Sequence, residues 1–483
     1  AEFKGSDAVK ALLAENESFG YQLWIDGGKA VQRSYGADQY GVKQEVTLRV
    51  KNILDPAIDQ AFNEERANIK VNASVFMRLS NGQCIETDVM SYSFKEVAEL
   101  AASRYDSYND AQKEALDQLG SEFGDMFFHW AVPSIHHLDG WTGTDSIPTT
   151  TGKYYLTKDI SVSSTAKIAP DQEVTLCLNG HKINATARIY YVSGTLNICD
   201  CCREKAQDEQ GAIISSSTGT MGAILYMYHG GEFNLYSGNL TATNSYTQGA
   251  VIVLGGDSGK YTNENDRLQT FNMYGGKIYG GKVTGNGGII STVRDGIINM
   301  YGGQIVGGTA NGNGGNLYLK GSAAEGMVFN MYGGTISGGM AANGGNIYCG
   351  LKAQVNLYGG TVEKGSADNG GNLYFESTAS TNLVINGGGT VDGGQANAHG
   401  GNIFIKNYGS FVFNDLTVSN GYAKGDGGNM YLFTDMECAN YTEEEFDVRL
   451  HNCTVTGGQA DDAGDSIYVM EADLTISGNT VIH

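Results

Sequence analysis

Apolar and polar residues alternate with a period of two through a phrase that recurs along the second half of the chain. The phrase INMYGGQIVGGTANGNGGNLYL starts at Ile298, and FNMYGGTISGGMAANGGNIYCG starts at Phe329. The Gly-Gly pairs that follow a tyrosine begin at 275, 302, 333 and 359, so the steps are 27, 31 and 26 residues. A period of this length, with two phrases in each step, indicates a solenoid.

Three short strands are predicted in each repeat. In the NMY segments, Met300 and Met331 alternate with asparagine and tyrosine, which is the period of a β-strand and not of a helix. The segment after each GGN alternates in the same way, and a third, shorter strand carries one apolar residue, such as Ile336. Glycine permits sharp corners, and no proline follows Pro170. The pattern predicts a three-stranded parallel β-helix.

The first 140 residues follow another pattern, with short strands and then two amphipathic helices. Ser93 and Glu96 form a capping box before the first predicted helix, and Asn109 opens the second. The predicted strands cover residues 21–26, 45–50, 72–79 and 84–94. The predicted domains are an α+β module at 1–140, a linker at 141–153 and a β-helix at 154–483.

Composition and charge exclude some classes of function. All four prolines and all three tryptophans lie in the first 170 residues, whereas 57 of the 69 glycines come later. The net charge is −22 and the pI about 4.7, so phosphate backbones and anionic membranes are repelled. No apolar run reaches the roughly 20 residues that a bilayer span needs. We therefore predict no nucleic-acid binding and no membrane insertion.

Some of these segments resemble known families. GGNIY and FNMYGG resemble the GGA-I and F-x-x-N repeats of chlamydial polymorphic outer-membrane adhesins, although asparagine mostly replaces the alanine of GGA-I here. YYLTKDISV, VTLCLNGHKI and LNICDC are similar to large surface β-helix proteins of gut Firmicutes. The resemblance covers about two thirds of the chain and implies a right-handed parallel β-helix. Such β-helices include adhesins, matrix proteins and pectate-lyase-like enzymes.

Aromatic residues recur in step with the repeat and are the candidate binding residues. If the methionines point inward, their tyrosine neighbours point outward beside a row of asparagines. The same rule predicts a second outward row after GGN. These rows either stabilise the sheets by stacking or form a recognition surface for sugars or another protein. The first row is Tyr236, Tyr274, Tyr301, Tyr332 and Tyr358, and the second is Tyr318, Tyr348, Tyr374, Phe404, Tyr431 and Tyr468.

Two groups of residues raise the question of a metal ion. Cysteines at 199, 201 and 202 lie one repeat after Cys177 and near His181, so a thiolate site is geometrically possible. The spacing lacks C-x-x-C, and stacked core cysteines are the interpretation we favour. His136, His137 and Asp139 lie close together with His129, but adjacent residues of a strand point to opposite faces. We assign no metal and no cofactor.

Catalytic patterns are weak in this sequence. GDSG at 256–259 resembles a serine-protease segment, but its surroundings fit a turn. Only five arginines follow residue 170, and none recurs in step with an acidic pair, as a polysaccharide lyase or hydrolase would need. Acidic clusters at 443–447 and 461–465 fit solvated loops, with weak Ca²⁺ binding as the alternative. We assign no catalytic residue.

The sequence therefore favours a non-enzymatic, secreted or cell-surface protein with a structural or adhesive role. The alternative is a β-helix enzyme that binds or cleaves polysaccharides. Expected partners are cell-surface glycans, host proteins or a second copy of the chain. The last ten residues, LTISGNTVIH, still alternate as a strand does, which predicts either that the natural chain continues or that this end pairs head-to-tail with another subunit to form filaments.

Overall fold

The computed structural model describes most of the chain after residue 140 and part of what precedes it. The chain divides into two compact units, Ala1–Val132 and Pro133–His483. The described residues are 18–25, 31–35, 70–78, 84–86, 88–93, 96, 140–202, 210–217, 221–255, 268–321, 326–350, 353–376, 383–406, 411–433, 447–470 and 473–483.

The first unit contains a small antiparallel sheet. Its strands are β1 (Ser18–Ile25), β2 (Val31–Tyr35), β3 (Lys70–Arg78), β4 (Cys84–Glu86) and β5 (Met90–Ser93), in the order β2-β1-β3-β4 with β5 also paired to β3. The strand β2 was not expected, and the segment predicted at 84–94 forms two strands instead of one. The predicted strand at 45–50 lies outside the described residues.

The capping box predicted at the end of this sheet is present. The backbone N–H of Glu96 donates to the Ser93 hydroxyl at 3.1 Å, and the Ser93 N–H donates to the Glu96 carboxylate at 2.8 Å. This reciprocal pair satisfies two donors that the start of a helix would otherwise leave open. The two predicted helices themselves lie outside the described residues.

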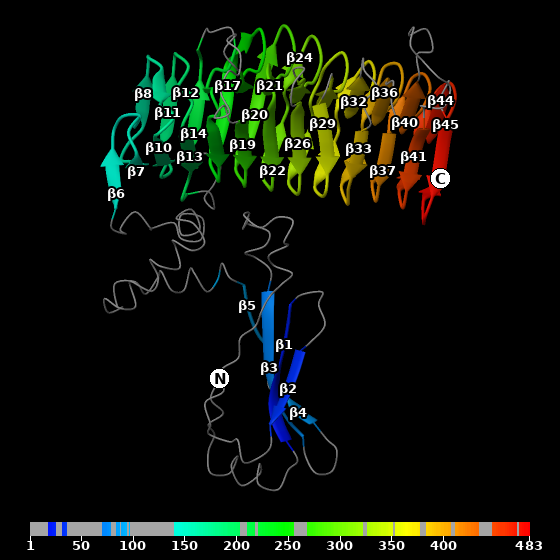
Figure 1. Ribbon diagram of the computed structural model, residues 1–483, viewed down its shortest axis with the longest axis horizontal. Helices are drawn as coiled ribbons and strands as arrows, with labels where there is room; N and C mark the ends of the chain where they lie inside the picture. Colours follow the sequence, from blue (N-terminus) through cyan, green and yellow to red (C-terminus); the bar gives the residue numbers. More distant parts are fainter. Residues whose placement is uncertain are drawn as a thin grey trace. The chain divides into compact units, whose positions relative to one another are not determined.

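The second unit is built from long sheets of parallel strands stacked side by side, as Figure 1 shows. A bridge between Leu357 and Gly387 joins a nine-stranded sheet to a group of four strands, and together we call them sheet 1. Its strands, in chain order, are β6 (Trp141–Thr144), β7 (Gly152–Leu156), β10 (Glu173–Cys177), β13 (Thr195–Cys199), β16 (Glu232–Leu235), β19 (Gln269–Met273), β22 (Gly296–Met300), β26 (Met327–Met331), β29 (Ala353–Leu357), β33 (Leu383–Asn386), β37 (Phe411–Asn414), β41 (Asp447–His451) and β45 (Asp473–Ser477).

Sheet 2 has thirteen strands and follows sheet 1 in every repeat. It contains the short strand that carries one inward apolar residue. Its strands are β8 (Ile160–Val162), β11 (Lys182–Ala185), β14 (Ala212–Ser215), β17 (Asn239–Tyr246), β20 (Lys277–Val283), β23 (Gln304–Val306), β24 (Thr309–Ala310), β27 (Thr335–Ser337), β30 (Thr361–Glu363), β34 (Thr390–Asp392), β38 (Thr417–Ser419), β42 (Thr454–Thr456) and β46 (Val481–Ile482).

Sheet 3 has eleven strands and contains the segments that follow GGN. A further strip of two-residue strands lies between sheets 2 and 3 in the chain: β31 (Ser366–Ala367), β35 (Gln395–Ala396), β39 (Tyr422–Ala423) and β43 (Gln459–Ala460). The strands of sheet 3 are β9 (Ala166–Ile168), β12 (Tyr190–Val192), β15 (Leu225–Met227), β18 (Ile252–Leu254), β21 (Ile290–Thr292), β25 (Leu317–Leu319), β28 (Ile347–Cys349), β32 (Leu373–Glu376), β36 (Ile403–Lys406), β40 (Met430–Phe433) and β44 (Ile467–Met470).

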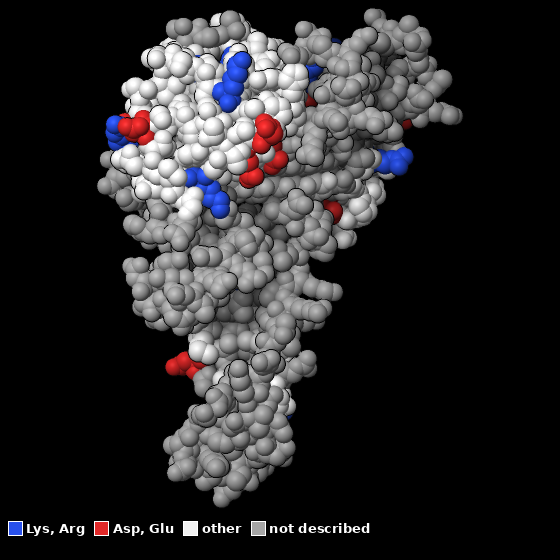
Figure 2. Space-filling view, turned by 60° about the vertical axis from the view of Figure 1, so that its left-hand side comes forward, with Lys and Arg blue, Asp and Glu red and all other residues white. Residues whose placement is uncertain are grey.

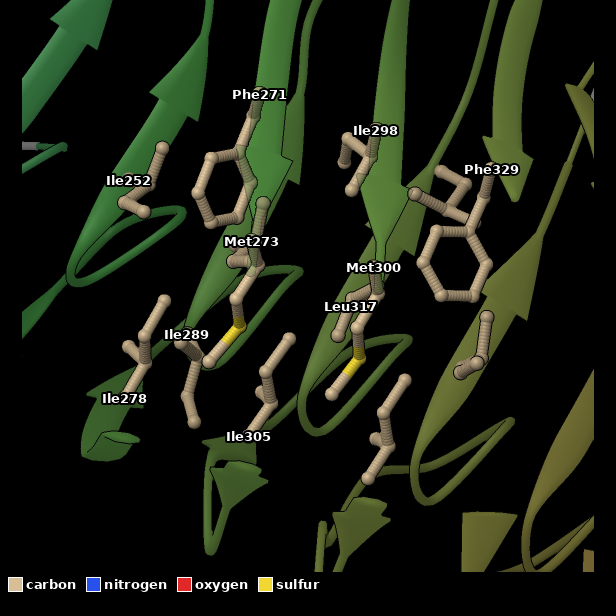
Figure 3. Close-up of a cluster of buried hydrophobic side chains, with 14 of the residues drawn as sticks. Ile252, Phe271, Met273, Ile278, Ile289, Ile298, Met300, Ile305, Leu317 and Phe329 are labelled. Atoms are coloured by element: carbon tan, nitrogen blue, oxygen red, sulfur yellow. The ribbon is translucent and has the colours of Figure 1, made fainter. Parts of the chain in front are cut away.

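The core lies between these sheets and continues from repeat to repeat. Figure 3 shows Phe271 and Met300 of sheet 1, Ile278 and Ile305 of sheet 2 and Leu317 of sheet 3 pointing into the common interior. All five side chains have no solvent exposure. Burying such a side chain stabilises the fold by roughly 1.5–3 kcal/mol, so each repeat gains stability mainly from the side chains of its neighbours.

The glycines of the repeated phrase occupy backbone positions that other residues fill poorly. Gly303 follows the tyrosine of its repeat with φ +83°, in the left-handed region where a Cβ is strained. Gly315, in the NGGN segment, has no space for a side chain, because a Cβ there would lie 2.1 Å from the Gly345 carbonyl oxygen. One corner therefore needs glycine for its dihedral angles and the other for the close approach of the next repeat.

The stacked strands begin earlier than the sequence predicts. The segment expected to be a linker, 141–153, contains β6, and Trp141 of that strand aligns with Lys153 of β7. Sheet 1 therefore starts at Trp141 and not near residue 154. The WTGT segment is short and has few apolar residues, so its alternation gives little sign of a strand.

Candidate functional site

The first predicted row of tyrosines forms a stacked column at the end of the sheet 1 strands. Each ring directly follows an inward methionine or leucine, so strand alternation turns the ring outward. Neighbouring ring centroids are 4.6–5.1 Å apart, and the ring planes are tilted by only 7–14°. We call these rings column A: Tyr236, Tyr274, Tyr301, Tyr332 and Tyr358.

The last ring of column A differs from the others in exposure. Tyr358 is 43% exposed, whereas the four preceding rings are half-buried. Leu357 is bridged to Gly387, so Gly388 occupies the position of the next ring and places no side chain over Tyr358. A Cβ at Gly388 would meet only the Tyr358 carbonyl oxygen, at 3.3 Å. Among the described residues, no aromatic ring covers the outer face of the Tyr358 ring.

A ladder of asparagine side chains lies beside column A. Each amide nitrogen donates to the amide oxygen of the previous repeat at 2.8–2.9 Å. Such ladders hold neighbouring strands in one alignment. Because their donors and acceptors bond to one another along the row, these amides mainly order the column and are poor ligand groups. The ladder consists of Asn197, Asn234, Asn272, Asn299, Asn330 and Asn356.

The second predicted row also stacks, but it is buried. Its neighbouring centroids are 4.9–5.4 Å apart, and its first five rings are each 6–9% exposed. The Tyr348 hydroxyl donates to the Glu376 carboxylate at 2.7 Å. Rings with so little exposed area offer a partner almost no surface, and this row fits a structural role. We call it column B: Tyr318, Tyr348, Tyr374, Phe404, Tyr431 and Tyr468.

Several phenols of the two columns have a raised pKa. Burial raises the pKa of Tyr301 to about 12, with a smaller contribution from the charge that Tyr332 would carry. Burial also raises the pKa of Tyr274, as do its neighbours Tyr236 and Tyr301. In column B, burial raises the pKa of Tyr348, and its hydrogen bond to Glu376 acts in the same direction. Tyr274, Tyr301 and Tyr348 therefore stay neutral at ordinary pH.

A second ladder of asparagines was not recognised from the sequence. The last residue of each GGN segment is fully buried, at Asn316, Asn346, Asn372, Asn402 and Asn429. The Asn346 amide nitrogen donates to the Asn372 amide oxygen at 2.7 Å and to the Glu363 carbonyl at 2.8 Å. The Asn372 amide oxygen also accepts the Gly365 N–H at 2.8 Å. The strict recurrence of GGN was the available signal, because an alanine could make none of these bonds.

One exposed cluster combines acidic and basic side chains on adjacent repeats. Glu363 and Asp392 are directly aligned on sheet 2, and Lys364 lies 2.8 Å from Glu363. The Asp392 carboxylate accepts hydrogen bonds from Ser419 at 2.6 Å and Asn420 at 2.7 Å. The hydrogen bond to Glu363 raises the pKa of Lys364, so this lysine stays protonated at neutral pH. It can attract an anion but cannot act as the general base of a lyase.

The predicted cysteines come together outside the main core. Cys177 and Cys199 are aligned at the ends of β10 and β13, at the positions that Tyr236 occupies in the next repeat. Both are buried, on the outer face of sheet 1 and not with the inward residues Leu176 and Ile198. The Cys177 thiol contacts the thiols of Cys199 and Cys201, and burial raises its pKa. His181 instead lies beside Asp159, at 3.3 Å.

The remaining candidates carry little chemistry. Asp461 accepts a hydrogen bond at 2.9 Å from Tyr422 of the previous repeat, and Asp465 accepts the N–H of the nearby Ala460 at 3.0 Å, so these contacts connect repeats and stabilise a local loop. The positions outside the described residues are His129, His136, His137, Asp139, the GDSG segment at 256–259 and the acidic residues 443–445.

Comparisons of the chain with protein-family models, with curated proteins and with solved structures found no match. Within the described parts of the chain, no helix is both long and apolar enough to cross a bilayer. The fold and the columns described above are therefore the basis for any statement about function.

Proposed function

We propose that the second unit is a right-handed, three-stranded parallel β-helix. Strands that pair within a sheet come from successive repeats, and each complete repeat contributes a strand to each of the three sheets. Connections between parallel strands of one sheet are right-handed in about 98% of cases. The resemblance of the GGN and FNMYGG segments to surface adhesins supports the same hand.

We also propose that the protein is a non-enzymatic, extracellular structural or adhesive solenoid that binds glycans through column A. The observation that carries this proposal is the uncovered ring of Tyr358. The inner rings have both faces stacked on neighbours, so they present edges and hydroxyls to solvent. Tyr358 has one open face above Gly388, which a sugar ring can cover by continuing the column.

The surface charge favours a neutral sugar over an acidic one. On the face shown in Figure 2, the charged side chains of the described residues are few; most stand apart in uncharged surface, and one pair of opposite charge lies side by side. The whole chain has a net charge of −22, which repels acidic polysaccharides unless lysines and arginines gather locally. A neutral glycan needs no such cluster, since an apolar ring face and nearby hydroxyls are sufficient.

Two substitutions at the end of column A test this proposal. Tyr358→Ala removes the open ring and should weaken binding to a neutral glycan about tenfold, because one stacked ring contributes on the order of 1 kcal/mol. Gly388→Tyr keeps Tyr358 but adds a ring over its face, at a position with room for a Cβ and no positive φ. It should weaken binding as much. Calorimetric titration with glycans selected from an array measures both effects.

The matched control is Tyr301→Phe, which keeps a ring inside the column and should leave glycan affinity unchanged. The triple change of Tyr301, Tyr332 and Tyr358 to serine should abolish binding while the circular dichroism of the strands remains. If Gly388→Tyr and Tyr358→Ala both bind glycans as well as the unchanged chain does, column A has only a structural role.

A polysaccharide-cleaving enzyme is the alternative, and the cluster around Lys364 is the feature that would favour it. That cluster places two carboxylates and a lysine on adjacent repeats, but its lysine lacks the lowered pKa of a catalytic base. Incubation with acidic and neutral polysaccharides, followed by assay for unsaturated ends and reducing ends, distinguishes the two functions. Turnover that is lost in Lys364→Ala would establish the enzyme.

A further inference from the structure

Four thiols and one carboxylate converge at the first repeats of sheet 1. Cys177 and Cys199 lie at the ends of adjacent strands, and the loop after β13 brings Asp200, Cys201 and Cys202 against them. All five residues are at most 8% exposed. In the following repeats the equivalent position carries the rings of column A. Along this row of equivalent positions, the first repeats carry thiols and the later ones carry tyrosines. The change occurs next to the loop that supplies the thiols of Cys201 and Cys202.

The spacing of these groups suits a small cation. One carboxylate oxygen of Asp200 and the sulfurs of Cys201 and Cys202 lie within 4.8 Å of one another. The Cys177 sulfur is within hydrogen-bonding reach of the Cys201 sulfur. Three donors therefore lie together, and a fourth, the Cys177 sulfur, lies next to one of them; four donors is the number that a closed, tetrahedral zinc site uses.

Asp200 supplies an independent reason to expect a cation. Its side chain is fully buried, and the carboxylate accepts N–H groups of Gly180 at 2.8 Å, Cys202 at 3.3 Å and Gly211 at 2.7 Å. None of these donors carries a formal charge. The same arrangement fixes the carboxylate beside the thiols, as the outer hydrogen bonds of metal ligands do.

We propose that Asp200, Cys177, Cys201 and Cys202 bind one thiophilic divalent cation of the Zn²⁺ type. Each thiol that becomes a ligand releases its proton, and the metal forms a bond to the resulting thiolate. With four protein donors no coordination position is left for substrate, so the ion has a structural role. It ties the loop after β13 to the outer face of sheet 1. This inference does not depend on the proposed binding of glycans.

The test uses the full chain, freed of metal with a chelator under reducing conditions. Addition of Zn²⁺ should load one ion per chain, and Co²⁺ should give the sulfur-to-cobalt charge-transfer absorption of thiolate ligation. In the double variant Cys201→Ser and Cys202→Ser, affinity should fall at least ~100-fold, since half of the ligands are lost. Cys84→Ser, which changes an exposed thiol of the first unit, should bind as the unchanged chain does.

The unchanged chain alone can refute the proposal, whether or not the double variant folds. A Co²⁺ titration that gives no charge-transfer band overturns it. Equal Zn²⁺ binding by the double variant also overturns it, because the metal then lies elsewhere. If peptide mapping of the purified chain finds a disulfide among these cysteines, and reduction does not restore Zn²⁺ binding, the cluster is a cross-link instead.

Discussion

The buried asparagines of GGN show how one residue type stabilises a corner of the fold. Asn372 uses its amide nitrogen for the Asn402 amide oxygen at 2.7 Å and the Asp392 carbonyl at 2.9 Å. Its amide oxygen accepts from Asn346 and Gly365. Buried polar groups are tolerated when all their bonds are made, and a ladder of identical amides achieves this in every repeat.

We predict that Asn372→Asp strongly destabilises the fold. The change puts a carboxylate oxygen where the amide donated two hydrogen bonds, so acceptors face each other in a fully buried corner. The expected cost is about 3 kcal/mol or more, or else the carboxyl becomes protonated. Thermal unfolding followed by circular dichroism measures the loss.

The control for this prediction is the same substitution in the ladder beside column A. Asn330 is only half-buried, and there it donates to Asn299 at 2.9 Å. Water can solvate a carboxylate at that position, so Asn330→Asp should cost less than about 1 kcal/mol. Equal unfolding midpoints for the two variants would contradict the importance that we assign to burial of the GGN ladder.

Single residues also show what the sequence can predict. The alternation of apolar and polar residues gives the direction of a side chain, and Ile336 is buried while Thr335 is partly exposed, as expected. It does not say how deeply an outward side chain is covered. Tyr348 points away from the main core and is still only 7% exposed, whereas Tyr358 is 43% exposed. The solvent exposure of an outward side chain depends on contacts with residues that are distant in the sequence. The alternation of apolar and polar residues carries no information about those contacts.

At the scale of the element, the strands with inward pairs of apolar residues were predictable and the shorter ones were not. The strips β31, β35, β39 and β43 have two residues each, too few for alternation to be seen. They form because each pairs with the equivalent segment of the next repeat, where the alanine recurs, as Ala367 aligns with Ala396. The strand β6 was missed for a similar reason.

Each stacked column extends over several strands, and the effect of high pH on its tyrosines can be tested. The pKa of Tyr301 in the folded state is about 12, above the unperturbed value of about 10. Between these values the folded chain holds a proton that the unfolded chain has lost, so stability is fully present below pH ~10 and decreases as pH rises toward 12. The other raised phenols of the columns act in the same direction.

Absorbance of the phenolate as a function of pH measures this effect. We expect the phenols with a raised pKa, among them Tyr274, Tyr301 and Tyr348, to ionise above pH ~10, together with the loss of strand circular dichroism. Tyr301→Phe should remove one of the late groups. If all tyrosines ionise in one step near pH 10 and the fold stays intact, the column rings are more accessible than the structure indicates.

For the whole molecule, the two ends of the stacked sheets differ from every interior repeat because each has a neighbour on one side only. The strands β6, β8 and β9 end the three sheets in the direction of the N-terminus, and β44, β45 and β46 end them in the other. At the second end Ile476 is 51%, Val481 41% and Met470 39% exposed. Unpaired edges with exposed apolar residues favour pairing with another chain.

Two explanations of this end remain: the natural chain continues over it, or a second copy covers it. In the second case, which can be tested, β6, β8 and β9 of the second copy offer parallel strand edges like those that the next repeat offers inside the stack. Such a head-to-tail contact does not close on itself and produces filaments. Light scattering and electron microscopy should show assemblies that grow with concentration. The double change Ile476→Lys and Val481→Lys should reduce assembly, because it places like charges on an edge without altering the core. Deleting residues 1–140 shows whether the first unit limits access to the other end. A full chain that remains monomeric at high concentration would rule out assembly through these edges and leave adhesion by single molecules.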